Sequence, residues 1–86
     1  MSEPGAARTL SDLPVGQGGR ITALTGAADI RQRLREMGLT AGAQVDVVRR
    51  APLGDPLDIR VRGYHLSIRL AEAACVCLEP SAAGLP

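Results

Sequence analysis

Hydrophobic and polar residues alternate one by one along two neighbouring stretches in the second half of the chain. In residues 57–62, Leu57, Ile59 and Val61 share one face and charged residues occupy the other. Such alternation is typical of a strand with one buried face. Residues 64–70 repeat the pattern, and four of them are expected to face inward: Tyr64, Leu66, Ile68 and Leu70. With three shorter apolar runs, the pattern predicts five strands, at residues 20–24, 44–50, 57–62, 64–70 and 75–79.

A different periodicity predicts one short helix between the first and second of these strands. Three apolar residues recur at a spacing of three or four, which places them on one helical stripe: Ile30, Leu34 and Met37. We expect Asp29 to cap the helix and Gln32 to complete a capping box. Gly38 stands where a left-handed residue ends a helix, so that Leu39 folds back onto it. Residues 71–74 are expected to form a turn or a single helical turn.

The remaining segments are predicted loops and tails. Leu10 and Leu13 are placed to close one end of the core. Residues 51–56 hold two prolines and a glycine, which exclude a strand and indicate a constrained loop. Leu53 at its centre has two alternatives: it covers the end of the core, or it stands exposed as a docking element. A proline-bounded loop loses little entropy on binding, which suits the second alternative.

The predicted fold is mainly β: a small SH3-like five-stranded barrel with one short helix inserted after the first strand. A barrel removes the exposed edges of a small sheet. A barrel of the oligonucleotide/oligosaccharide-binding type is the alternative architecture. We expect three parts in the 86 residues: a disordered tail at 1–8, the barrel domain at 9–80 and a second tail at 81–86.

Charge and composition exclude several functions. The formal net charge is +1, and Tyr64 is the single aromatic residue. The chain therefore lacks the strong positive field of a nucleic-acid binder, the stacking platforms of a single-strand binder and the aromatic groove that binds proline-rich peptides. His65 is the one histidine and has no acid or nucleophile at a recognisable spacing, so we expect no catalysis. No stretch is long enough for a transmembrane helix or resembles a signal peptide, which predicts a cytoplasmic protein without direct membrane insertion.

Metal binding has only a small set of candidate ligands. Cys75, Cys77 and His65 share the outward parity of their predicted strands, so an incidental nitrogen–sulfur site is conceivable. Three ligands do not close a site, and two cysteines on a strand are more often small strand residues. Asp55 lies between glycine and proline and is interpreted first as a turn former. We predict no metal site and no cofactor.

Two motifs, in this order and spacing, resemble the FeoA family of bacterial ferrous iron uptake. The first is Leu-x-x-Met-Gly-Leu-x-x-Gly at residues 34–42, and the second is Ala-Pro-Leu-Gly-Asp-Pro at residues 51–56. The resemblance extends from about Thr9 to Pro80. It implies an SH3-like barrel and a non-catalytic accessory role.

The resemblance also implies a partner, the membrane transporter FeoB, which carries a cytoplasmic GTP-hydrolysing domain. The expected effect is binding and modulation of that GTPase region. The alternative is a metal-linked regulatory domain, similar to the C-terminal SH3-like domain of iron-dependent repressors. Candidate partner-binding residues lie on the predicted loop and on the arginine side of the helix: Leu53, Asp55, Arg31 and Arg35.

Overall fold

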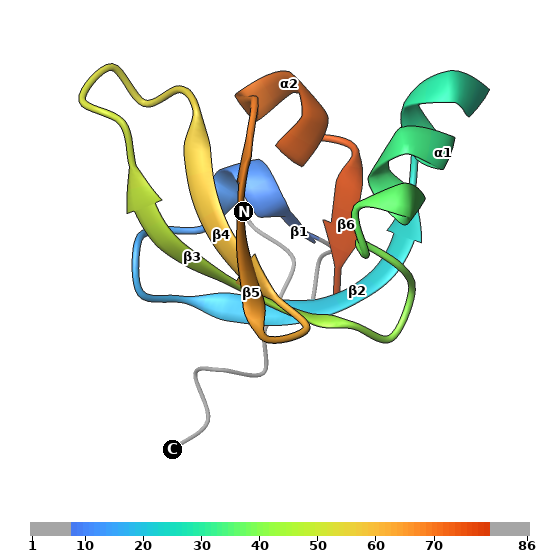
Figure 1. Ribbon diagram of the computed structural model, residues 1–86, viewed down its shortest axis with the longest axis horizontal. Coiled ribbons are helices and arrows are strands. Elements are labelled where there is room, and N and C mark those ends of the chain that lie inside the picture. The colour runs from blue at the N-terminus through green and yellow to red at the C-terminus, as the bar shows by residue number, and fades with distance from the viewer. Residues whose placement is uncertain (1–7, 80–86) are drawn as a thin grey trace, which may run out of the picture.

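The computed structural model describes residues 8–79 as one curled antiparallel sheet with two short α-helices at its open end (Figure 1). The elements follow one another as β1 (Arg8–Thr9), the 3₁₀ helix η1 (Leu10–Asp12), β2 (Gly18–Leu24), α1 (Ala28–Glu36), β3 (Gln44–Arg50), β4 (Leu57–Val61), β5 (Tyr64–Ile68), α2 (Leu70–Ala73) and β6 (Val76–Leu78).

The sheet has the strand order β1-β6-β2-β3-β4-β5. The register shifts between Ile21 and Ala23 in the β2–β6 pair, and between Val47 and Arg49 in the β3–β4 pair. Such bulges bend a strand and increase its twist. The sheet therefore curls around its apolar side chains instead of lying flat, as the SH3-like prediction requires.

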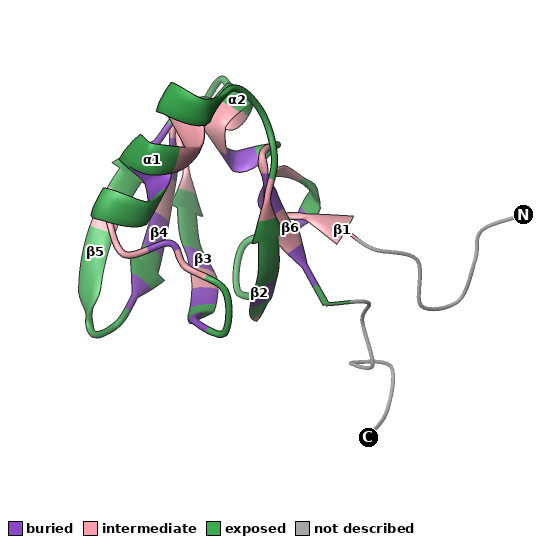
Figure 2. Ribbon diagram, turned by 90° about the vertical axis from the view of Figure 1, so that its right-hand side faces the viewer, coloured by how far each residue is buried: buried purple, intermediate pink, exposed green. Residues whose placement is uncertain are grey.

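The core collects the inward residues of β2 to β6 together with Leu10 and Leu13 near the start of the domain. Leu10 and Leu13 are completely buried and close one end of the core, as predicted. Leu34 is the buried residue of α1, with Ile30 and Met37 packed partly against the core. The core contains Leu10, Leu13, Ile21, Leu34, Leu39, Ala43, Val45, Val47, Leu57, Ile59, Val61, Ile68, Ala73, Val76 and Leu78. Figure 2 colours the buried stretches purple, and they include parts of β3, β4 and β6.

The mainly β, SH3-like prediction is confirmed, and each of the five predicted strands is present. The structure adds β1, whose two residues pair with β6, so the sheet has six strands and α1 follows the second of them. A two-residue strand is too short to produce a periodic signal in the sequence. The predicted tails at 1–8 and 81–86 lie outside the described residues, except for Arg8, which belongs to β1.

Two strands end earlier than the alternation predicts. Strand β4 stops at Val61, because Arg62 takes a positive φ of 51° and forms a two-residue turn with Gly63. Strand β5 stops at Ile68, and Leu70 starts α2 instead of extending the strand. Tyr64 was expected to face inward but is 44% exposed.

The capping prediction for α1 is wrong in detail. Ala27 is the N-cap residue, and no side chain caps the helix. Asp29 lies inside the first turn, where its Oδ1 accepts the backbone N–H of the adjacent Ile30 at 3.0 Å. Gln32 donates to Glu36 on the helix surface instead of returning to the N-terminus. The carboxylate still lies at the positive end of the helix dipole, where a negative charge is favourable.

Candidate partner-docking site

The loop between β3 and β4, residues 51–56, is closed by its own backbone. The Ala51 N–H donates to the Pro56 carbonyl at 3.1 Å, and the Gly54 N–H donates to the Ala51 carbonyl at 2.7 Å. Gly54 has a φ of +89°, a conformation that glycine adopts without the cost that a side chain would bring. The predicted constrained loop is therefore confirmed.

Asp55 attaches this loop to the next helix. Its Oδ1 accepts the backbone N–H of Leu70, the first residue of α2, at 3.0 Å. The guanidinium Nη1 of Arg69 lies 3.9 Å from the same oxygen. The carboxylate thus satisfies an N–H group that the helix itself leaves without a partner. The loop is held at both ends and also at its side.

Leu53 projects from this fixed loop into solvent. Its side chain is 96% exposed, whereas the other large exposed hydrophobic residues of the described chain range from 41% for Val48 to 54% for Val15. The alternative in which Leu53 covers the core is therefore wrong. Because the loop is already ordered, a partner that covered this side chain would bind at little entropic cost, which makes Leu53 a candidate docking residue.

The two candidate arginines form a separate surface. Arg31 and Arg35 lie on α1, and Figure 1 shows α1 and the loop on opposite sides of α2. Among residues 8–79 neither arginine forms an ion pair, whereas Arg33 between them pairs with Glu72 at 3.2 Å. The Nε of Arg31 is buried without a hydrogen-bond partner. The four candidate partner residues thus share one end of the molecule but do not form one patch.

The three candidate metal ligands are not brought together. His65 lies on β5 and Cys77 on β6, and three strands separate β5 from β6 in the sheet. Cys75 follows α2, and its thiol lies 3.6 Å from the Ala71 carbonyl, to which it donates. In the described part of the chain, no three His, Cys, Asp or Glu side chains form a group that could hold a metal ion.

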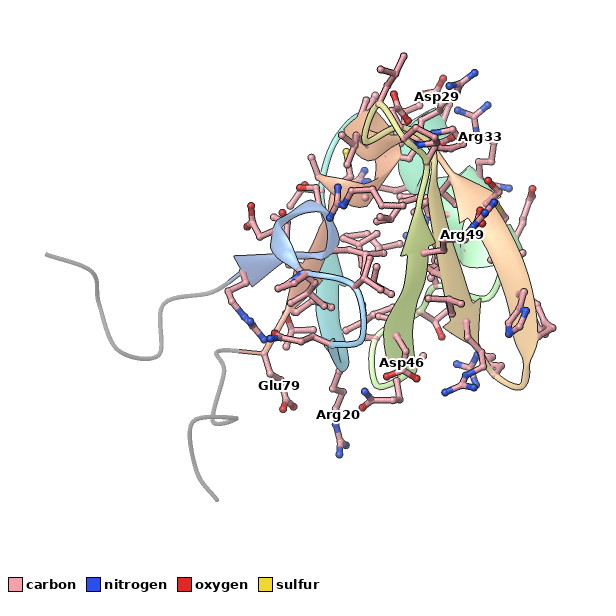
Figure 3. The ribbon with its side chains drawn as sticks, turned by 90° about the vertical axis from the view of Figure 1, so that its left-hand side faces the viewer. Arg20, Asp29, Arg33, Asp46, Arg49 and Glu79 are labelled. Atoms are coloured by element: carbon pink, nitrogen blue, oxygen red, sulfur yellow. The ribbon has the colours of Figure 1, made fainter. Side chains whose placement is uncertain are left out.

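The structure also contains a surface feature that the sequence did not predict. A pocket of about 320 Å³ opens on the outer side of β3, β4 and β5. The ion pair between Arg49 and Asp58, with Nε 3.3 Å from Oδ2, forms one wall (Figure 3 labels Arg49). The bulge at Val48 shapes this wall, and bulges have no clear signal in the sequence. The lining residues are Val48, Arg49, Asp58, His65, Leu66 and Ser67.

The curled six-stranded sheet, the two short helices and the projecting loop define a small SH3-like domain. Residues 8–80 match the FeoA domain family, and the chain belongs to this family. The FeoA family is associated with ferrous iron transport and is not a known enzyme family.

Similar proteins support this assignment. A Porphyromonas gingivalis protein that fuses Fe(2+) transport protein A with the Fe(2+) transporter FeoB is 37% identical over 70 residues, which are 81% of this chain and 8% of the relative. The chain thus spans less than a tenth of that relative's length. The FeoA of Stenotrophomonas maltophilia, an SH3 domain protein solved with zinc, is 34% identical, with a TM-score of 0.74 over 88% of this chain and 92% of its own. The FeoA of Chlorobium tepidum is 33% identical, with a TM-score of 0.76 over 86% of this chain and 71% of its own.

A manganese-dependent transcriptional repressor shares the fold at a TM-score of 0.78, covering 90% of this chain and 43% of the repressor. Its sequence identity is only 12%, so this similarity concerns the fold alone. Within residues 8–79, no helix combines the length and apolar character needed to cross a membrane.

Proposed function

We propose that this chain is a non-catalytic, cytoplasmic accessory protein of ferrous iron uptake that binds an FeoB-type transporter. The observation that carries the proposal is Leu53, which is 96% exposed on a loop fixed by backbone and Asp55 hydrogen bonds. Because the loop is already ordered, docking costs little conformational entropy. The Porphyromonas gingivalis fusion of related sequences supports the choice of partner, since one chain there contains both proteins.

The proposed docking surface is the cytoplasmic GTPase region of the transporter. Leu53 would enter an apolar socket, and Asp55 would keep the loop in its binding conformation. A binding protein shifts a nucleotide cycle only if its affinity differs between the states of that cycle. We therefore expect different affinities for the GTP-bound and nucleotide-free domain. The repressor-like alternative is supported only by a shared fold at 12% sequence identity.

Calorimetric titration of the chain into the isolated cytoplasmic domain of its cognate transporter, with and without a GTP analogue, tests this proposal. Leu53→Asp should weaken binding by about thirtyfold or more, the loss expected for a side chain at the centre of an interface. Val15→Asp places the same charge on another exposed hydrophobic residue and should bind like the parent chain.

Circular dichroism establishes that both variants are folded before the titration. Absence of binding in either nucleotide state would exclude the GTPase region as the partner. Binding that is lost with Arg35→Ala but retained with Leu53→Asp would place the interface on α1 and contradict the role of the loop.

A further inference from the structure

The two edges of the sheet differ in how they are protected. The β1 edge has two residues, one of which is the charged Arg8. The β5 edge has five residues, Tyr-His-Leu-Ser-Ile, with no proline, lysine, arginine or acidic residue. Proteins normally protect an edge strand with charges, proline, a bulge or a short length, because an open edge pairs with other strands. The β5 edge has none of these features.

The hairpin geometry shows which backbone groups lie on this edge. Val61 and Tyr64 flank a two-residue turn, so they form the first hydrogen-bonded pair of the β4–β5 ladder. Bonded and non-bonded pairs alternate along antiparallel strands, and therefore His65 and Ser67 direct their N–H and C=O groups away from β4. Both residues are exposed, and no turn or loop bond within residues 8–79 involves them. Figure 2 and Figure 3 show β5 at the outer side of the molecule.

We propose that two copies of this chain pair through their β5 strands, antiparallel, about a two-fold axis at Leu66. The outward N–H and C=O groups belong to His65 and Ser67, which flank Leu66. A two-fold axis at Leu66 therefore places the groups of each residue opposite those of the other in the second copy. In this register His65 of each copy faces Ser67 of the other, and each facing pair exchanges two backbone hydrogen bonds. The result is one continuous sheet across both copies, stabilised by four new bonds.

The charges near this edge are compatible with the pairing. Arg62 lies in the turn before β5 and Arg69 is the N-cap residue of α2, so neither arginine belongs to the paired strands. Like charges directly opposite would destabilise the pair. The strands themselves carry no charge that could repel. When β5 pairs with its own copy, it meets no proline and no like charge of an acidic residue, lysine or arginine, and for that reason the second copy is the occupant that we assign.

A five-residue edge is smaller than the roughly 800 Å² per partner of a standard stable interface. The dimer is therefore weak and reversible. Sedimentation equilibrium of the full chain, from micromolar to millimolar concentration, should show a shift from the monomer mass towards twice that mass. Amide hydrogen exchange measured over the same range should slow at His65 and Ser67 and remain constant at Tyr64, which is already bonded to β4.

Ser67→Pro tests the backbone pairing directly, since proline lacks an N–H and is tolerated where that group faces away from the sheet. It removes two of the four bonds and should weaken dimerisation at least about tenfold. Ser67→Ala retains the N–H and should dimerise like the parent chain. If Ser67→Pro does not fold, the exchange measurement on the parent chain decides.

Each of these results would overturn the proposal: a monomer at every concentration, equal dimerisation of the proline and alanine variants, or slowed exchange at residues other than His65 and Ser67. Slowed exchange at the β5 edge only after addition of another protein, with the chain itself monomeric, would also overturn it and assign the edge to a different partner.

Discussion

Gly38 ends α1 in a conformation that a residue with a side chain adopts only at a cost. Its φ is +95°. The Gly38 N–H bonds to the Arg35 carbonyl at 2.9 Å and the Leu39 N–H bonds to the Leu34 carbonyl at 3.0 Å, which together form a Schellman motif. A Cβ on Gly38 would also overlap the hydroxyl of Tyr64. That hydroxyl is fixed in place because it donates to the Met37 carbonyl at 2.7 Å.

Gly38→Ala should therefore lower the free energy of unfolding by about 2 kcal/mol, from the left-handed backbone and the overlap together. Gly42→Ala is the matched control, since Gly42 has a φ of +91° and open space around its Cβ position. Gly42→Ala should lower the free energy of unfolding by about 1 kcal/mol, from the left-handed backbone alone. Urea unfolding of both variants, each with and without Tyr64→Phe, separates the two contributions. Equal losses at the two glycines would contradict a steric role for Tyr64.

Single residues also show where sequence reasoning ends. The helix stop at Gly38 follows from local chemistry and is confirmed. The inward position of Tyr64 is wrong, because alternation indicates a face of the strand and not the depth at which a long side chain lies. Its polar tip reaches the end of α1 at the rim of the core. The cap at Asp29 is wrong because the helix begins earlier than the acidic residue that the motif suggests.

At the scale of elements, the loop of residues 51–56 and α2 form a unit that neither segment indicates alone. The loop is predictable from its prolines and glycine, and a single helical turn was predicted at residues 71–74. The bond that joins them links Asp55 to Leu70, 15 residues further along the chain. No local pattern encodes a contact over that separation. The order of the docking loop therefore depends on a helix of four residues.

Asp55→Ala should lower the free energy of unfolding by about 1 kcal/mol, the usual value for one lost hydrogen bond. The ion pair with Arg69 is 3.9 Å long and largely exposed, so it contributes little. Asp55→Asn is the control, since its amide oxygen still accepts the Leu70 N–H. Amide exchange at Leu70 should become faster in Asp55→Ala and remain unchanged in Asp55→Asn. Faster exchange in both variants would show that the charge, and not the acceptor, holds the loop.

At the scale of the whole molecule, α1 has a side that packs into the core and a side that faces solvent, so the effect of a substitution in this helix depends on which side it changes. Leu34 is fully buried in the common core, whereas Arg35 is exposed and Arg31 is half-buried. The strand pattern predicted this core well, because inward residues repeat regularly. The pairing of β1 with β6 and the pocket beside the Val48 bulge were not predictable, because both depend on how distant segments meet.

Leu34→Ala should lower the free energy of unfolding by about 3 kcal/mol, within the range for truncating a buried leucine. A domain of this size has only about 5–10 kcal/mol in total, so much of its stability would be lost. Ile30→Ala, at a partly buried position of the same stripe, should cost less. Thermal unfolding of both variants measures the difference. Equal losses of stability in the two variants would mean that α1 is not anchored to the core through Leu34. If Leu34→Ala binds a partner poorly because it is partly unfolded, binding should recover at a lower temperature.

The antiparallel pairing of Arg8 with Leu78 places the start and the end of the domain next to each other. Figure 3 shows β1 on a different side of the molecule from the loop of residues 51–56. A covalent linker attached at either end therefore leaves Leu53 unobstructed. Such a domain can be joined to a larger protein without redesign, and the length of the linker, rather than the cellular abundance of the domain, then sets its effective concentration at the binding site. This geometry is compatible both with a separate protein and with a domain that is covalently joined to its partner.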